Sequence, residues 1–471
     1  MSLTALPPDR FDRAAAAHLL ARAGFGGPPR DVDRLHALGL QGAVDSLLDF
    51  SAEAVEPPEW VVPGVEIRHR AERLREHPEP MTEDEIAQYT TRQRNRDLAR
   101  TAHTADWWFD RMYVTSTPLR EKLTLFWHGH FAIQASKVQN GPAIWSQNQM
   151  FRRYGAGPFT ELLRQLCRDP AMLRYLDNDE NRRGKPNENF GRELLELFTL
   201  GEGNYTEEDV REAARALTGW GIESDRMVFA RHADQHDDGT KTVLGTTGPL
   251  DGDDIVRIVT SRPRCWQFLG GKLQRFFVRD DRDPDLTEAI AVHLERHEGH
   301  IGETLRDLFT SREFYSESAR LARVKGPVEW LVGFLRSLEL GTPPAPWRRD
   351  LLENLGQSMF EPPNVAGWPG GRRWITAAAL LTRFRALADL LLTPGLSPVI
   401  RDDVRETLIR GTRRETADAL IDRLFLPPPA EGVRRELARL LDPLPPPDTW
   451  TDADLREAIS RFVGTFHYQL V

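Results

Sequence analysis

A dense run of acidic, amide and basic side chains lies between residues 187 and 200. At about 100° per residue, Glu188, Arg192 and Glu196 share one helical face, and their polar neighbours fall within an arc of about 140°. Carboxylates held together can acquire different pKa values for acid–base catalysis, or can bind a metal ion. The alternative is a solvated face with weak i,i+4 ion pairs. The catalytic candidates here are Glu188, Arg192, Glu193 and Glu196, and the substrate-binding candidates are Asn187 and Asn189.

Two histidines flank a glycine in the sequence FWHGHF at residues 126–131. Residues two apart do not share a helical face, but an extended turn or helix end at Gly129 would let both imidazoles reach one ion. Imidazole suits zinc, iron or copper, with carboxylates completing the shell. His128 and His130 are therefore candidate metal ligands. The alternative is a buried pair that bonds to the backbone among aromatic side chains.

A third polar group lies in the expected hairpin loop, between residues 232 and 241. A His–Asp pair can act as a base with its orienting partner, or as a metal ligand with a supporting carboxylate. His236 is a candidate metal ligand, Asp237 a catalytic candidate and Lys241 a substrate-binding candidate. The alternative is a polar turn set by Asp238-Gly239.

The segment from Glu361 to Trp374 is too rich in Gly, Pro and Trp to form a helix. It predicts a structured loop whose indole rings could line a pocket or stack on a sugar, or could simply cover a core. The substrate-binding candidates in it are Trp368, Arg372 and Trp374.

His293 and His297 also have the i,i+4 spacing of a zinc site, but the glutamate of a metalloprotease motif does not follow His293. Both precede Gly299 at the end of an expected helix. We therefore expect them to interact favourably with the helix dipole rather than to bind a metal.

The overall composition excludes several classes of function. The 471 residues include 62 Lys and Arg against 71 Asp and Glu, a net charge of −9, which argues against nucleic acid or an anionic membrane as a partner. Two cysteines cannot form a disulfide framework. No leader, long apolar run, P-loop, nucleophile elbow or dinucleotide fingerprint is evident. We expect a cytoplasmic protein.

Helical periodicity runs through most of the chain. A loop rich in Pro and Glu is expected at about 51–66. One β-hairpin is expected at about 227–245, from strands Met227 to Arg231 and Lys241 to Leu244. The sequence predicts an all-α fold, in which residues 1–471 form a single large multi-helical domain with this small β-hairpin insertion.

Several ordered motifs resemble the bacterial family catalogued as domain of unknown function 1800. The motifs are His18-Leu19-Leu20 with Gly24-Phe25-Gly26, Trp127 to Phe131, Asn187 to Phe190 with Arg192-Glu193-Leu194, Ala216 to Trp220, His236-Asp237 with Lys241, Lys325 to Glu329, and Pro362 to Pro369. Members often look exported and are encoded beside a sulfatase-like family. The resemblance therefore implies extracellular polymer or ester chemistry and a sulfatase-like partner protein, although no leader is evident here.

The leading hypothesis is a metal-dependent hydrolase that acts on a polar small molecule or glycan. One divalent ion (zinc, iron or manganese) would activate water in a helical pocket. The pocket would be formed by the histidines at 128–130, the polar face at 187–200 and the polar group at 232–241. Three alternatives stay open. They are a metal-free glycan-cleaving enzyme with paired carboxylates, a non-catalytic binding or assembly protein, and an iron-dependent redox enzyme.

Overall fold

The computed structural model describes residues 3–51, 53–61, 81–223 and 227–471, and the expected all-α fold class is confirmed. The first helices are α1 (Arg13–Ala23), α2 (Pro29–Ala37), α3 (Gly39–Leu48), α5 (Glu83–Val114), α6 (Pro118–His130), α7 (Ala135–Val138), α8 (Gly141–Tyr154), α9 (Phe159–Leu166), α10 (Pro170–Tyr175), α11 (Glu188–Glu193) and α12 (Glu207–Ala216). The later helices are α13 (Gly252–Thr260), α14 (Pro263–Phe277), α15 (Pro284–Arg296), α16 (Ile301–Phe309), α17 (Pro327–Leu338), α18 (Ala345–Asn354), α19 (Ala377–Leu392), α20 (Asp402–Leu408), α21 (Arg413–Leu424), α22 (Glu431–Ala438) and α23 (Asp452–Val463). No described helix is both long and apolar enough to cross a bilayer.

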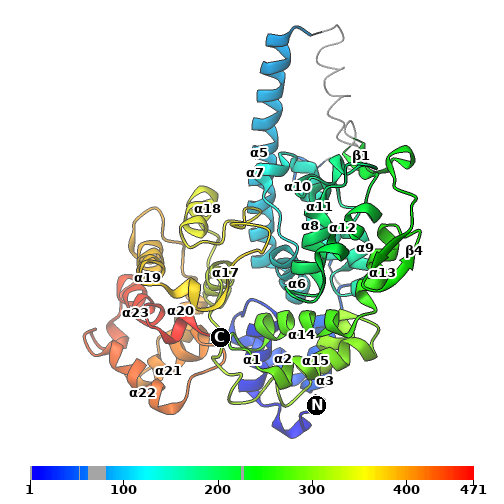
Figure 1. The fold of residues 1–471 in the computed structure, drawn as a ribbon. Coiled ribbons are helices and arrows are strands. Elements are labelled where there is room, and N and C mark those ends of the chain that lie inside the picture. Colours follow the sequence, from blue (N-terminus) through cyan, green and yellow to red (C-terminus); the bar gives the residue numbers. More distant parts are fainter. Residues whose placement is uncertain (1–2, 52, 62–80, 224–226) are drawn as a thin grey trace.

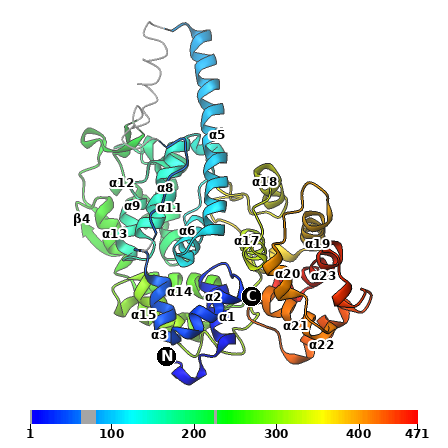
Figure 2. The ribbon, with the colours of Figure 1, turned by 180° about the vertical axis from the view of Figure 1, so that it is seen from behind.

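The helices form three neighbouring groups (Figures 1 and 2). Helices α1–α3 lie beside α14 and α15, the group from α6 to α13 lies above them, and α17–α23 form a lobe to one side. Helix α5 runs past the second group and projects beyond it. Segments far apart in sequence are therefore neighbours, so long-range contacts must fix the arrangement.

Side-chain caps explain where many helices begin. In five of them, the side chain of the residue before the helix accepts a hydrogen bond from the backbone N–H of an acidic residue three positions later. The acidic side chain in turn accepts a hydrogen bond from the backbone N–H of the residue before the helix. Both N–H groups would otherwise be unpaired. These pairs are Thr82 with Glu85, Thr206 with Asp209, Asp251 with Asp254, Thr412 with Glu415, and Thr451 with Asp454.

The predicted hairpin is wrong in its pairing, although both of its strands exist. Strand β1 (Trp220–Glu223) pairs antiparallel with β2 (Val228–Arg231), and β3 (Lys241–Val243) pairs antiparallel with β4 (Thr246–Gly248). Each strand thus joins its nearest neighbour in sequence. The Asp238-Gly239 turn signal marks the connection between two small sheets instead of the tip of one.

The predicted helix at 187–200 changes its geometry halfway. Helix α11 ends at Glu193, and a π-helical segment follows at Leu194–Thr199. The Leu200 N–H donates to the Leu195 carbonyl at 2.9 Å, the i→i+5 pattern of a π-helix. The wider turn rotates Glu196 away from the direction that a regular helix would give it.

The stretch rich in Pro and Glu is irregular as far as it is described. Residues 53–58 form neither helix nor strand, and residues 62–66 of the expected loop lie outside the described residues. Glu53 accepts hydrogen bonds from Thr115, Ser116 and Thr117, which ties this stretch to the α5–α6 connection.

Two adjacent charged residues, both 0% exposed, lie in the first half of α6. Glu121 accepts hydrogen bonds from Trp108 (3.0 Å) and Arg111 (3.0 Å) on α5 and from Arg152 (2.8 and 2.9 Å) on α8. Lys122 donates to the Gly24 carbonyl at 2.8 Å after α1 and pairs with Glu329 on α17. Helix α6 thereby holds three neighbouring helices and the end of α1.

Glu329 lies between two cations and also caps its own helix. Arg323 donates two hydrogen bonds to its carboxylate, at 2.6 and 2.8 Å, and the Gly326 N–H donates a third at 2.9 Å. Burial alone would raise the pKa of Glu329, but Arg323 and Lys122 hold the pKa well below its ordinary value. Glu329 is therefore ionised.

Replacing this carboxylate should destabilise the fold strongly. We expect Glu329→Gln to lower the free energy of unfolding by about 3–5 kcal/mol, because Lys122 and Arg323 would remain buried without their counter-charge. Urea unfolding followed by circular dichroism measures this. The control is Glu431→Gln, which breaks a pair with Arg414 whose two side chains are each 58% exposed, and which should cost less than about 1 kcal/mol. Equal losses in both variants would contradict the prediction.

Candidate functional site

Among the residues that the structure describes, one group of three side chains is arranged to hold a metal ion: His293, His297 and Asp307. His293 lies in the last turn of α15, His297 caps that helix, and Asp307 comes from α16 after a short turn. His293 Nδ1 and His297 Nε2 lie 2.6 and 2.7 Å from the same Asp307 oxygen. The three ligand atoms all lie within 4.8 Å of one another.

The chemistry of this group suits a transition metal. Two imidazoles and one carboxylate are ligands for zinc, iron or manganese, and three protein ligands leave further coordination positions free. The side chains are 6%, 25% and 31% exposed, so one side of the group faces solvent. Burial opposes ionisation of Asp307, but hydrogen bonds from both histidines lower its pKa.

The sequence prediction missed this group because it considered only the histidines. Their place at the end of a helix predicts an interaction with the helix dipole, whereas the structure adds a carboxylate from the next helix. The available signal was an acidic residue ten positions after His297, beyond a glycine that ends α15. The short turn between α15 and α16 brings these residues together.

The structure places the predicted metal ligand His128 among aromatic rings. Its ring lies 4.9 Å from Phe360, 5.3 Å from Trp368 and 5.7 Å from Trp108, between ring centres. Burial lowers its pKa to about 3, so the imidazole is neutral. Its Nε2 has no hydrogen-bond partner among the described residues.

His130 lies at the end of α6, also within an aromatic cluster. Its Nε2 contacts the Phe198 carbonyl at 3.1 Å, and burial lowers its pKa to about 3. Neither it nor His128 belongs to a three-ligand group in the described chain. The structure therefore does not bring the two histidines together with carboxylates, and their surroundings match the buried alternative.

The third predicted ligand, His236, belongs to an internal network around the β2–β3 connection. Its Nδ1 contacts the Thr218 carbonyl at 2.8 Å. Asp237 pairs with Arg215 at 2.8 Å and accepts an N–H bond from Gly239, while Lys241 donates to the Asp237 and Gly239 carbonyls. Arg215 lowers the pKa of Asp237 to about 2. These residues are partnered by the chain itself.

The predicted catalytic face at 188–196 holds ion pairs near the surface. Arg192 pairs with Glu188 at 3.2 Å and with Glu207 on α12 at 2.7 Å. Glu196 instead accepts a hydrogen bond from the Tyr205 hydroxyl. Glu193 is half-buried, and burial together with Glu196 raises its pKa. Three carboxylates around one guanidinium are thus not seen, because Glu196 has a different partner.

The two predicted substrate-binding asparagines position the start of α11. Asn187 caps the helix by accepting from the Asn189 N–H at 3.0 Å. Its amide donates to the Asp177 carbonyl at 3.2 Å, and the Asn189 amide donates to the Leu176 carbonyl at 3.2 Å. Both side chains therefore bind the preceding backbone.

The Gly-, Pro- and Trp-rich loop crosses the ends of two helices. Trp368 lies against Gly129, where an added Cβ would be 3.5 Å from its ring, and Trp374 lies against Gly326, where the distance would be 2.9 Å. Arg372 is 81% exposed and lies 3.5 Å from Asp281. The two half-buried indoles thus pack on the protein, whereas Arg372 is exposed.

Comparison with known proteins confirms the family. The chain belongs to the family described as Protein of unknown function (DUF1800), which matches residues 18–470. No curated protein and no solved structure matches the chain. The family membership covers nearly all of the sequence and assigns no activity.

The Arg215–Asp237 pair should make the free energy of unfolding depend on pH in the acidic range. The folded pKa of Asp237 is about 2 against an ordinary 3.8, so its stabilisation is present above pH 4 and is lost as the pH falls toward 2. We expect Asp237→Asn to cost about 2 kcal/mol at pH 6 and much less at pH 2. Urea unfolding across this pH range measures the difference. Asp234→Asn, an exposed neighbour, is the control, and a pH-independent cost for Asp237→Asn would refute the prediction.

Proposed function

We propose that this protein is a metal-dependent enzyme that holds one divalent transition-metal ion at His293, His297 and Asp307. The observation that carries the proposal is the convergence of three ligand atoms from α15 and α16. A bound ion of this kind supplies Lewis acidity and lowers the pKa of a coordinated water, which favours hydrolysis of a polar substrate. The partial exposure of His297 and Asp307 leaves room for that water.

Hydrogen bonding within the group supports a site whose ligands are already positioned. Asp307 holds both rings through one oxygen, so the three donors already converge on one place, although each nitrogen must exchange its proton-mediated bond to Asp307 for a bond to the ion. His293 is almost fully buried and would anchor the ion, whereas the two more exposed ligands face the direction from which a substrate arrives.

The donor set also favours a second candidate, an iron-dependent redox enzyme. Two histidines and one carboxylate with open positions are the ligand set of many non-haem Fe(II) oxygenases. The identity of the metal separates the two candidates, because zinc does not change its oxidation state.

Elemental analysis of protein purified without a metal-affinity tag tests the site. We expect about one zinc, iron or manganese per chain in the wild type, and loss of that metal in His297→Ala and Asp307→Asn. His36→Ala, which removes an exposed histidine of α2, is the matched control and should keep the metal. Circular dichroism establishes that each variant is folded. A folded wild type that stays metal-free after incubation with each ion would exclude the proposal.

Cobalt substitution tests whether the coordination shell is open. Co²⁺ at this group should give visible d–d absorption that changes on addition of azide, because the anion takes a position that no protein ligand fills. His36→Ala should respond like the wild type. A cobalt spectrum that azide leaves unchanged would show a closed, structural site and would overturn the enzymatic part of the proposal.

A further inference from the structure

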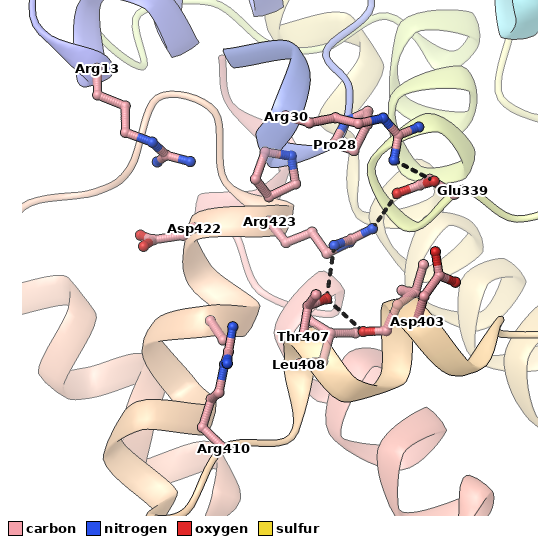
Figure 3. A pocket seen from close by; sticks show the side chains of 13 residues that line it. Arg13, Pro28, Arg30, Glu339, Asp403, Thr407, Leu408, Arg410, Asp422 and Arg423 are labelled. Carbon is pink, nitrogen blue, oxygen red and sulfur yellow. Dashed lines mark hydrogen bonds and ion pairs between the residues drawn. The ribbon is translucent and has the colours of Figure 1, made fainter. Parts of the chain in front are cut away.

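A cavity of about 380 Å³, lined by both charged and apolar side chains, lies where the N-terminal helices meet the C-terminal lobe (Figure 3). Arg13 comes from α1, Arg30 from α2, and Arg410 and Arg423 from the region of α20 and α21. Figure 3 shows Arg13 and Arg410 extending toward the same space beside Arg423. The cavity has the size of typical small-molecule sites, which range over about 300–1,000 Å³.

One carboxylate in this cavity is shared by three guanidinium groups. Glu339, at the end of α17, lies 2.6 Å from Arg423, 2.7 Å from Arg30 and 3.3 Å from Arg401. The Glu339 side chain is 10% exposed and that of Arg423 is 5% exposed. Arg401 also pairs with Asp403, so two carboxylates balance these three guanidinium groups, and the side chains of Arg30 and Arg401 extend into solvent.

A second cavity of about 560 Å³ adjoins the first and shares Pro28, Arg30 and Glu339 with it. Together they are lined by seven arginines and four carboxylates. The arginines are Arg13, Arg30, Arg34, Arg336, Arg401, Arg410 and Arg423, and the carboxylates belong to Asp31, Glu339, Asp403 and Asp422. This positive excess stands out on a chain with a net charge of −9.

Two of these arginines are available to a ligand. Arg34 and Arg410 are exposed, and neither forms an ion pair with a residue that the structure describes. Arg30 is 65% exposed and can turn from Glu339 toward the cavity. Guanidinium groups bind oxyanions through paired, nearly parallel hydrogen bonds, which a lysine cannot offer.

We propose that these joined cavities bind a small organic molecule carrying a phosphate group. Arg13 also pairs with Asp33 at 2.7 Å, and the arginines still outnumber the carboxylates when Asp33 is counted. This positive excess calls for a multiply charged anion, and a phosphate ester carries about −1.5 to −2 at neutral pH. Arg30 and Arg410 would contact the phosphate, while the buried Arg423–Glu339 pair holds the wall of the cavity in place. The site is independent of the metal group on α15 and α16.

Calorimetric titration with inorganic pyrophosphate tests the proposal. The protein is first treated with a chelator, so that removal of a bound metal by pyrophosphate does not contribute to the measured heat. We expect wild-type protein to bind pyrophosphate, and Arg30→Gln and Arg410→Gln each to weaken binding by about tenfold. Arg257→Gln, which removes a 66% exposed arginine on α13, is the matched control and should bind like the wild type.

Other anions at matched ionic strength distinguish the chemistry. Sulfate and citrate should bind at least about tenfold more weakly than pyrophosphate. If citrate binds as tightly as pyrophosphate, the site recognises carboxylates as well as it recognises phosphate, and the proposal is wrong. Absence of pyrophosphate binding, or binding that Arg30→Gln and Arg410→Gln leave unchanged, would do the same.

Discussion

The adjacent buried charges on α6 constrain much of the rest of the molecule. Consecutive helical residues point about 100° apart, so Glu121 and Lys122 reach different neighbours. Glu121 holds α5 and α8, while Lys122 holds the end of α1 and, through Glu329, α17. A charge buried without its partner is costly, so packings that separate these helices are strongly disfavoured. We infer that this pair fixes how distant parts of the chain assemble.

The same requirement explains why several motifs that look catalytic are engaged internally. His236 and Lys241 bond to nearby carbonyls, and Asp237 pairs with Arg215. Any buried polar group needs a partner, whether it serves catalysis or packing. Residue type and spacing therefore cannot distinguish a catalytic side chain from one that serves packing. The distinction requires knowing where the hydrogen-bond or ion-pair partner of that side chain lies. His128 differs from these residues, because its ring packs against three aromatic rings and its Nε2 has no hydrogen-bond partner among the described residues.

Local signals predicted the helices well, whereas the grouping of site residues depends on long-range contacts that local signals do not contain. Caps such as Thr206 and the proline at the start of α17 mark helix ends in the sequence itself. Both strands of the expected hairpin were found, but their true partners, β1 and β4, were not predicted, so the predicted pairing was wrong. The π-helical segment has no comparable local signal. Asp307 joins His293 and His297 only through the turn between α15 and α16. The single-domain organisation stays a prediction.

At the group of His293, His297 and Asp307, metal binding requires a change in which ring nitrogens carry protons. In the absence of an ion, each histidine donates the proton on its Asp307-facing nitrogen to one carboxylate oxygen. An ion bound by those same nitrogens requires that His293 Nδ1 and His297 Nε2 carry no proton, so each neutral ring must move its proton to the other nitrogen. A ring that is already charged must release a proton instead. Metal binding and the present hydrogen bonds therefore exclude each other at these two nitrogens.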